Sequence, residues 1–548
     1  MSRHRHKGKS SWLFIQTQCH TLLKHGRQTL LVHQQIPEAT SLPRHTLFRI
    51  EKSSLMTTID DIPESVLGII LASCLPIQAQ LPPQPSNDTR LILPSVCPKW
   101  RNIIVTTPTF WQNIIFNPLP LFKNPLNLFN LANTWLERSG CLPLSIEFGE
   151  KLQYDEEQGR KPKYVGHLLF GGSVNFNAFY TQVISTHAAR IRRLTCNLIT
   201  KATIISFLSL PPGFFQNLEA LNIKFIDEIT LPSSLKFFTA AERANFNLFC
   251  SQPQLRIVVL EICSGSGMRP LYLNLPWHQL TNLMMDKTPI CPGYFLKILK
   301  TSPSLVDGFF NIVFSGHSIK TSNDFLNHVT MPHLESLRLR LLNPSADPRV
   351  FDAVHLPALR IFWLELVDVK KGWDMGLYKS LLLHSTNTLQ SLALWNSPDP
   401  KLFRLKQDER SSRTLLRRAL KLETLLHVAN NVDRLWLPAG VYIDATTLKK
   451  IATGELLPFL RYFKVNSTSV SFTSILDVVR KRYESFVCAS QVPSTSQDHK
   501  IIPPFSLFSV DLTIVRVDVD RGSTASNTGR GIVWCYQCYG TYIRIVDQ

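Results

Sequence analysis

The sequence has no uninterrupted apolar run of eighteen residues, which is the minimum length of a typical membrane-spanning helix. Hydrophobic residues make up 44% of the 548 residues, and charged residues make up 18%. This balance is typical of a foldable chain with enough apolar side chains for a large core. We therefore expect a soluble protein without a membrane partner, built either as several compact domains or as one repeat array with a small additional module.

Recognisable catalytic motifs are missing as well. The chain has no His-Glu-x-x-His, no Gly-x-Ser-x-Gly and no complete phosphate-binding glycine loop. Cys535 and Cys538 form a single CxxC without a second pair, which is too little for a zinc site. The eleven cysteines are scattered and odd in number, as expected of free thiols in a reducing cytoplasmic or nuclear environment. We expect a non-catalytic protein without a metal or a cofactor.

Acidic residues are scarce relative to basic ones, at 40 against 59, and the net charge is +19. Residues 1–55 contain nine Lys or Arg against Glu38 and Glu51, so +7 of the charge lies there and +12 in the rest of the chain. Apart from the segment 413–421, no dense basic run with interleaved aromatic residues occurs. Nucleic acid is therefore not the expected partner, and an acidic protein ligand suits a basic binding face better.

Residues 1–55 show neither a periodic apolar face nor a repeat. Six of the sixteen histidines lie in this segment without a consistent ligand spacing, so no metal site is expected. We expect a basic, disordered N-terminal segment. Met56 stands directly before the first ordered pattern, and whether the working protein begins there or at residue 1 stays open.

The stretch 56–116 predicts a small helical module. Asp60 and Asp61 are expected to cap a helix that has Pro63 in its first turn. Its apolar residues recur at i, i+4 and i+8 in two adjacent rows, which are Val66, Ile70, Cys74 and Leu67, Leu71, Leu75. Trp100 and Ile103 are expected to cover one flank of this wide stripe. Roughly forty-five residues are too few to bury the remainder in a core of their own, so part of the stripe should meet another protein.

These residues resemble the F-box, in the variant common in fungal F-box proteins, where Leu-Pro-x-Glu-Ile-Leu is followed by a spacer and then by Val-Cys-x-x-Trp-Arg-x-Ile. The corresponding residues here are Ile62, Pro63, Ser65, Val66 and Leu67, then Val96, Cys97, Trp100, Arg101 and Ile103. The segments 107–111 and 135–144 also look like that group. Two positions depart from the pattern. Ser65 stands where the family usually has Glu, and Pro98 is expected inside the second helix, against the carbonyl of Pro94.

The resemblance implies that this module docks a Skp-type adaptor and, through it, a cullin. The adaptor-binding residues that it implies are Ile62, Pro63, Val66, Leu67, Ile70, Leu71 and Trp100. The alternative is a plain helical hairpin that caps the next domain. Residues 76–94, which are rich in proline, predict a loop between the two halves of the module.

The rest of the chain repeats a Leu-x-x-Leu-x-Leu unit. The units begin at positions 191, 218, 235, 255, 280, 305, 334, 359, 389, 432 and 460. Most steps lie in the window of roughly 20 to 29 residues that is expected of leucine-rich repeats. Each unit predicts a short strand that points its apolar side chains into a solenoid, followed by a helix or loop on the outer side. The longest step includes the charged run 401–421, which predicts an inserted loop and a basic helix.

The predicted fold class is therefore α/β, with a small N-terminal helical F-box-like module followed by a leucine-rich-repeat solenoid, or horseshoe. We divide the chain into the basic segment 1–55, the F-box-like module 56–116, a helix–strand connector with a charged insertion at 117–190, the solenoid at 191–480, and a C-terminal cap or tail with a β-hairpin at 481–548. Within the connector, a helix is expected over 126–138 and a strand over 144–148.

The leucines of the repeats are expected in the core, so a binding function must come from the residues between them. Exposed Trp and Arg side chains are typical interface anchors. The substrate-binding residues that we expect on the concave face are Arg338, Arg340, Trp363, Glu365, Trp395 and Trp436. With the F-box resemblance, these residues favour the substrate-recognition subunit of an SCF-type cullin-RING ubiquitin ligase with an unknown protein substrate. The alternatives are a ligase-independent leucine-rich-repeat scaffold and a binder of acidic ligands or nucleic acid.

Overall fold

The structure of the chain is a computed structural model. It describes residues 61–81, 89–116, 125–149, 178–198, 201–225, 238–262, 270–314, 328–342, 350–367, 378–397, 422–437, 443–466, 474, 477–482, 484, 507–512 and 541–542. The chain divides into two compact units, residues 1–62 and residues 63–548. Only residues 61 and 62 of the first unit are described, so the predictions for residues 1–55 lie outside the described residues.

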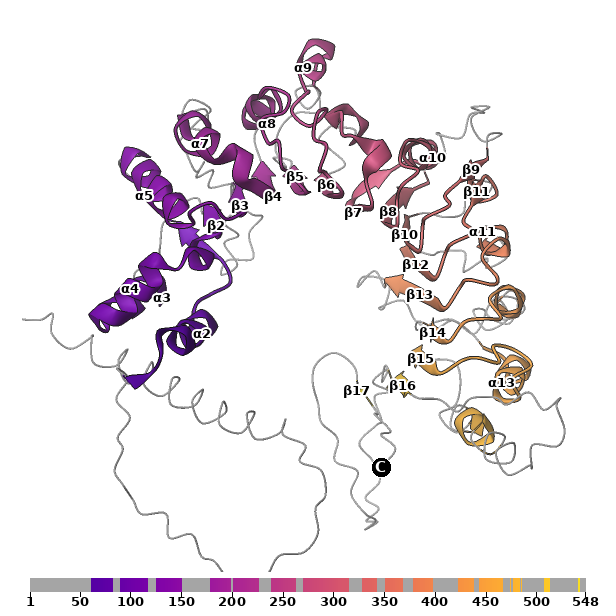
Figure 1. Cartoon of the computed structure of the whole chain (residues 1–548). Coiled ribbons are helices and arrows are strands. Elements are labelled where there is room, and N and C mark those ends of the chain that lie inside the picture. Colours follow the sequence, from indigo (N-terminus) through magenta and orange to yellow (C-terminus); the bar gives the residue numbers. More distant parts are fainter. Residues whose placement is uncertain are drawn as a thin grey trace, which may run out of the picture. The chain divides into compact units, whose positions relative to one another are not determined.

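The second unit is built on one large sheet whose strands follow the order of the chain (Figure 1). Neighbouring strands pair in parallel, except the last two, which pair antiparallel. The strands of this sheet are β1 (Ala79–Leu81), β2 (Asn113–Phe116), β3 (Leu144–Gly149), β4 (Ile191–Leu198), β5 (Ala220–Phe225), β6 (Ile257–Ile262), β7 (Asn282–Ile290), β8 (Asp307–Val313), β10 (Ser336–Leu342), β12 (Ile361–Val367), β13 (Ser391–Ser397), β14 (Arg434–Leu437), β15 (Tyr462–Asn466), β16 (Leu507–Leu512) and β17 (Thr541–Tyr542). Strands β9 (Val329–Thr330) and β11 (Val354–His355) form a separate pair.

The repeated leucines produce this sheet. Ten of the eleven predicted units coincide with a strand, and their first residues, such as Leu305 and Leu334, are fully buried. The next two apolar positions of each unit lie in register across the sheet, as Leu337 pairs with Phe362 and Leu339 with Leu364. Because successive side chains on a strand point to opposite faces, one face is apolar and buried, and the other carries the residues in between.

The unit predicted at Leu235 is wrong. Leu235 itself lies outside the described residues, Phe238 is buried, and Ala240 begins a short helix, α9 (Ala240–Ala244). Thr239 and Glu242 form a capping box at the start of that helix. This reciprocal pair of hydrogen bonds favours a helix where the apolar spacing alone predicted a strand.

The helices that follow the repeat strands lie on one side of the sheet (Figure 1). The α-helices among the described residues are α2 (Glu64–Cys74), α3 (Thr89–Ile92), α4 (Pro98–Thr106), α5 (Pro125–Arg138), α7 (Ser185–His187), α8 (Lys201–Leu208), α10 (Pro292–Thr301), α11 (Lys379–Leu383) and α13 (Ala445–Ala452), together with α9. Helix α10 illustrates the packing, because Phe295 and Leu299 are fully buried and Phe295 meets Phe310 of β8 edge-on at 5.1 Å. The apolar core therefore lies between the helices and the sheet.

The F-box-like stretch differs from the expected helical module in three respects. Helix α2 begins at Glu64 with Pro63 at the N-cap, and no side chain caps it, so the predicted aspartate cap is wrong. Pro98 is the first residue of α4, where a missing N–H costs nothing, so the predicted clash does not occur. The stretch also contributes β1 and β2 to the large sheet, and these strands pair with each other in parallel.

A buried arginine holds this region together. Arg90 of α3 is 3% exposed, and it donates hydrogen bonds to the carbonyls of Pro76, Gln78 and Phe110 at 2.6, 3.2 and 3.2 Å. These acceptors precede β1 and β2, so one guanidinium ties three segments of chain together. Hydrogen bonds of a charged donor are stronger than neutral ones, which offsets part of the cost of burying the charge.

The connector follows its prediction where it is described. The expected helix is α5 and the expected strand is β3. Trp135 of α5 packs edge-on against Trp111 at 5.1 Å, and both indoles are buried. The charged insertion expected at 150–163 lies outside the described residues, as do the basic run 401–421 and the CxxC cysteines.

A second buried arginine lies behind the last repeats. Arg482 is fully buried and donates hydrogen bonds to the carbonyls of Ile451, Leu457 and Pro458 at 2.7, 3.1 and 2.9 Å. Burial lowers the pKa of its guanidinium to about 10, so the group is still charged at neutral pH. Leu457 has a positive φ of 52°, an unfavourable conformation for a leucine, and Arg482 binds its carbonyl.

Candidate functional site on the open face of the sheet

The face of the sheet opposite the helices carries rows of side chains in register. Along one row, Arg338 of β10 pairs with Trp363 of β12, which pairs with Ala393 of β13. Ala393 in turn pairs with Trp436 of β14, which pairs with Lys464 of β15. Because parallel strands lie about 4.8 Å apart, one row brings together residues that are far apart in sequence.

The four large side chains of this row form a continuous stack. The guanidinium carbon of Arg338 lies 5.7 Å from the centre of the Trp363 ring, and Nζ of Lys464 lies 4.2 Å from the centre of the Trp436 ring. The two indoles are 5.9 Å apart with an angle of 36° between their planes, although β13 runs between their strands. Ala393 is small enough to let them meet above it. We call Arg338, Trp363, Trp436 and Lys464 the aromatic–basic row.

The row has a defined electrostatic character. Each indole has a cation over one face and the other indole beside it, so the electron-rich faces are engaged within the protein. An aromatic ring is electron-poor at its edge, which is the part that such a stack presents outward. Cations and ring edges together attract anions. Little indole face remains free for a planar base or ring of a ligand to stack upon.

Beside the row, two of the predicted binding residues neutralise each other. Arg340 donates two hydrogen bonds to the carboxylate of Glu365, at 2.9 and 3.0 Å. Glu365 is 8% exposed, and Arg340 also reaches the Asp286 carbonyl at 3.5 Å. A bidentate pair of this kind fixes both side chains. Arg340 and Glu365 therefore support the surface more than they offer free charge to a ligand.

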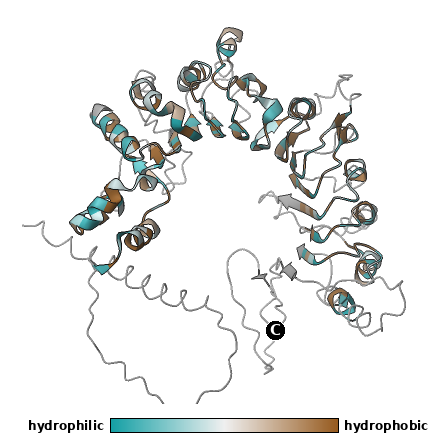
Figure 2. Ribbon diagram, in the orientation of Figure 1, coloured by the Kyte–Doolittle hydropathy of each residue, from teal (hydrophilic) through white to brown (hydrophobic). Residues whose placement is uncertain are grey.

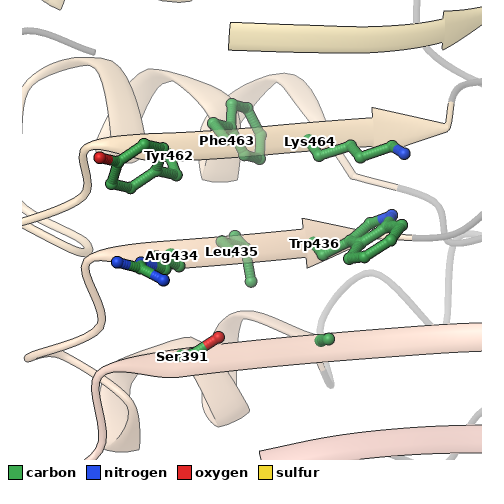
Figure 3. A pocket seen from close by; sticks show the side chains of 8 residues that line it. Ser391, Arg434, Leu435, Trp436, Tyr462, Phe463 and Lys464 are labelled. Atoms are coloured by element: carbon green, nitrogen blue, oxygen red, sulfur yellow. The ribbon is translucent and has the colours of Figure 1, made fainter. Parts of the chain in front are cut away.

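A pocket of about 370 Å³ opens next to the row, on strands β13, β14 and β15 (Figure 3). Figure 3 shows Arg434 beside Tyr462 at one end and Trp436 beside Lys464 at the other. The remaining lining residues are Ser391, Ala393, Leu435 and Phe463. The pocket exists because the side chains of Ser391 and Ala393 on β13 are small, whereas the side chains around it on β14 and β15 are large.

The cation at the far end of the pocket is held loosely. The Arg434 guanidinium carbon lies 5.0 Å from the centre of the Tyr462 ring, and its Nε is 3.7 Å from the Asp433 carboxylate. The Arg434 side chain is 63% exposed, and an ion pair so open to solvent is weak. A ligand carboxylate at this position can therefore replace Asp433 at little cost.

The sequence analysis missed the pocket residues Ser391, Arg434, Tyr462 and Lys464. The signal was available, because each occupies a position between the leucines of a repeat, as Trp363 and Trp436 do. Of the expected residues, Arg338, Trp363 and Trp436 come together in the row and are half-buried. The backbone of Trp395 pairs with Glu365, but its side chain lies outside the described part of the structure.

At strands β5 to β7 two lysines of the open face share one carboxylate. Glu261 lies between Lys224 and Lys287, whose Nζ atoms are 3.4 and 3.0 Å from its carboxylate. Across the described open-face residues of β10 to β15, the cationic side chains of Arg338, Arg434 and Lys464 gather next to the Arg340–Glu365 pair. The anion-attracting part of the face is thus the part that holds the row and the pocket.

A second surface lies on α2, and hydrophobic colouring dominates this helix (Figure 2). Val66 and Ile69 are 45% and 69% exposed, and their spacing of three residues places them on the same side of the helix. We call these two residues the α2 patch. Among the other residues that the F-box resemblance implied, Pro63 is exposed and Ile62 and Ile70 are half-buried, whereas Leu67, Leu71 and Trp100 are buried within the chain.

Ile69 was not among the residues expected from the resemblance, although it is the most exposed apolar residue of α2. The two i, i+4 rows did not include Ile69, which lies beyond the Val66 row on the side away from Leu67 and Leu71. Ile77, after the helix, is 88% exposed, and Leu91 of α3 is 43% exposed. Leu67 and Leu71 face inward and anchor α2, so contact with a partner falls to Val66, Ile69 and the half-buried Ile70.

Neither surface contains a catalytic constellation. Within the described ranges, no three His, Cys, Asp or Glu side chains gather closely enough to hold a metal ion. None of the described helices has the length and apolar character needed to cross a bilayer. No protein-family model matches the chain, and a comparison with curated proteins gives no match either.

Proposed function

We propose that this chain is the substrate-recognition subunit of an SCF-type cullin-RING ubiquitin ligase, acting in the cytoplasm, the nucleus or both. In this proposal the stretch 56–116 is an F-box-like module that docks a Skp-type adaptor, and the repeats bind a protein substrate. The observation that carries it is an exposed apolar patch, Val66 and Ile69, within the very residues that resemble the F-box. A separate anion-attracting surface on the repeats would bind the second partner, the substrate.

The arrangement of the strands supports the solenoid part of the proposal. Parallel strands that pair in chain order, most of them in the repeats preceded by a buried leucine, are what a leucine-rich-repeat solenoid requires. Every repeat then buries its apolar residues against its neighbours. The open face carries the variable residues, which is where a repeat protein places its binding surface.

The two departures from the F-box pattern do not oppose docking. Pro98 begins α4 without disturbing it, and Ser65 is exposed on α2, so neither introduces a clash or a buried polar group. The chain would contribute no catalytic group of its own. Its contribution would be proximity, because holding substrate and conjugating enzyme in one complex raises their effective concentration.

One observation favours a ligase-independent scaffold instead. Leu67, Leu71 and Trp100, three of the residues that the resemblance assigns to the adaptor, are 1%, 0% and 5% exposed. If the remaining exposed residues are too few to hold an adaptor, the module is a cap on the sheet. The open face would then bind its partner without recruiting a ligase.

Copurification of a Skp-type adaptor with the full-length chain separates these two functions. Changing Val66 and Ile69 together to Asp should abolish copurification, because an adaptor contact would bury unpaired charge. Ile257→Asp is the matched control, since Ile257 is a 42% exposed isoleucine on β6, and it should leave adaptor capture unchanged. Failure of the unmodified chain to capture the adaptor would leave the scaffold as the function.

A further inference from the structure

The pocket on β13, β14 and β15 combines features that define one class of ligand. Its walls are the rings of Trp436 and Tyr462, and Leu435 and Phe463, whose side chains are buried in the core behind the sheet, contribute their strand backbone to the floor. A volume of about 370 Å³ is enough for one or two amino-acid side chains. Lys464 and Arg434 carry positive charge at opposite ends (Figure 3). The pocket is thus apolar in the middle and basic at both ends.

We propose that this pocket receives an apolar side chain of an extended protein segment, whose flanking acidic groups contact Lys464 and Arg434. A third acidic group of the same segment contacts Arg338 at the other end of the aromatic–basic row. The acidic group is a carboxylate or a phosphate monoester. The inference rests on the part of the proposed function that places substrate binding on the open face, and it does not depend on adaptor docking.

The length of the segment follows from the sheet. From β10 to β15 the sheet has four strand-to-strand steps, through β12, β13 and β14. At about 4.8 Å each these steps span roughly 19 Å, which an extended peptide covers with about six residues. A segment of this length that lies across the strands reaches both Arg338 and Lys464. The apolar residue lies near one end, between its two acidic neighbours. A polyproline II backbone, with three residues per turn instead of strict alternation and a rise of about 3.1 Å per residue, spans the same distance and keeps both neighbours within reach of the sheet.

The same geometry disfavours single-stranded nucleic acid. Base stacking needs an open aromatic face. Trp363 and Trp436 each have a cation over the ring and the other indole tilted beside it, and Tyr462 has Arg434 over its ring. A ligand would have to displace those contacts before a base could stack. Carboxylates or phosphates on a peptide meet the cations without disturbing the rings.

Binding of labelled hexapeptides to the full-length protein, followed by fluorescence anisotropy, tests the inference. The probes have Glu at the first, third and sixth positions and Leu, Pro or Phe at the second, with Ser elsewhere, and each is also made in the reverse order. Matched sets carry Gln or phosphoserine in place of Glu. We expect the best Glu or phosphoserine probe to bind at least about tenfold more tightly than its Gln counterpart, the scale of a desolvated charge contact.

Comparison of the Glu and phosphoserine sets identifies the acidic group. Tight binding by phosphoserine alone assigns a phosphate, and comparable binding by both assigns a general anion contact. Equal binding of the Gln probes and of both acidic sets, or no binding by any probe, would overturn the inference. So would tighter binding of a six-nucleotide oligothymidylate that is lost on the same substitutions.

Two variants locate the site. Lys464→Gln removes one cation, and Ser391→Leu fills the pocket while leaving every cation in place; each should weaken the best probe about tenfold. Both positions lie outside the apolar core. Lys224→Gln is the matched control, because Lys224 is a cation on the same face at β5, remote from the pocket, and probe affinity should not change. Adaptor copurification should persist in all three variants, so failure of this inference is distinguishable from failure of the proposed function.

Discussion

Gly308 is the position where the repeat pattern and the packing depend on each other most visibly. It stands in register with Leu283 of β7 and Leu337 of β10, which are both fully buried leucines. A Cβ at Gly308 would lie 2.7 Å from Cε2 of Phe310 and 3.2 Å from Cδ2 of Leu305. The Phe310 ring therefore fills the volume that a leucine at 308 would occupy. The large side chain at position 310 thus compensates for the missing side chain at position 308, the preceding inward-facing position of the strand.

Replacing Gly308 by Leu should therefore overpack the core. Contacts under 3 Å force Phe310 off its rotamer or displace the strand, at a cost of about 1 to 3 kcal/mol in the free energy of unfolding. Phe310→Leu alone should also destabilise, because it leaves a cavity. The double variant restores the leucine pair found in β10. Its cost should be smaller than the sum of the two single costs by about 1 kcal/mol or more.

Chemical denaturation monitored by tryptophan fluorescence would give the three free-energy changes. Gly293→Ala is the control, because no atom lies within 4 Å of a Cβ built at Gly293 and the residue is in α10. That substitution should be neutral or stabilising by up to about 1 kcal/mol. If the free-energy costs of Gly308→Leu and Phe310→Leu were strictly additive, the two residues would not compensate for each other and the reasoning would be refuted. Unchanged stability of the Gly308→Leu variant would refute it as well.

Two further predictions concern titration and buried charge. Burial and, to a lesser extent, Arg190 lower the pKa of His187, and burial followed by His384 and His328 lowers the pKa of His355. On acidification the unfolded state therefore binds protons at these histidines before the folded state does, so the stability that they contribute should be full above about pH 6.5 and fall below it. A His187→Gln, His355→Gln variant should show a flatter dependence of the unfolding midpoint on pH. An unchanged slope would contradict this assignment. Arg482→Met should cost about 3 kcal/mol or more, because it removes three hydrogen bonds that a charged donor makes to carbonyls in the protein interior. Arg482→Lys should recover only part of that loss in the same assay. Full recovery by Lys would show that charge alone matters.

The strands of the repeats were predictable because their signal is local. A leucine at the first, fourth and sixth positions fixes which face of a strand is buried, and Leu334, Leu337 and Leu339 behave as that pattern requires. Pro98 and the unit at Leu235 were misjudged for a related reason. Their outcome depends on cap geometry one and four residues away, at Cys97 and at Thr239, which apolar periodicity does not report.

The candidate site was only partly predictable, because it depends on register between strands. Sequence alone indicated that Trp363 and Trp436 share a face, but not that a single alanine lets their rings meet across β13. Nor did it indicate that Arg340 and Glu365 would neutralise each other. The pocket beside Tyr462 arises from small residues on β13 that lie beside large residues on the next two strands, β14 and β15, which are 43 and 71 residues further along the chain when counted from Ser391 to Arg434 and to Tyr462.

The most direct test of the central claim, that one chain carries two independent binding surfaces, is a capture experiment with four proteins. The full-length chain, the Val66→Asp, Ile69→Asp variant, the Lys464→Gln variant and the combination of all three substitutions are each assayed for a Skp-type adaptor and for the best acidic hexapeptide. The account predicts that the α2 substitutions remove the adaptor and leave peptide affinity unchanged, that Lys464→Gln does the reverse, and that the combination loses both. Adaptor capture that survives the two aspartates would contradict it.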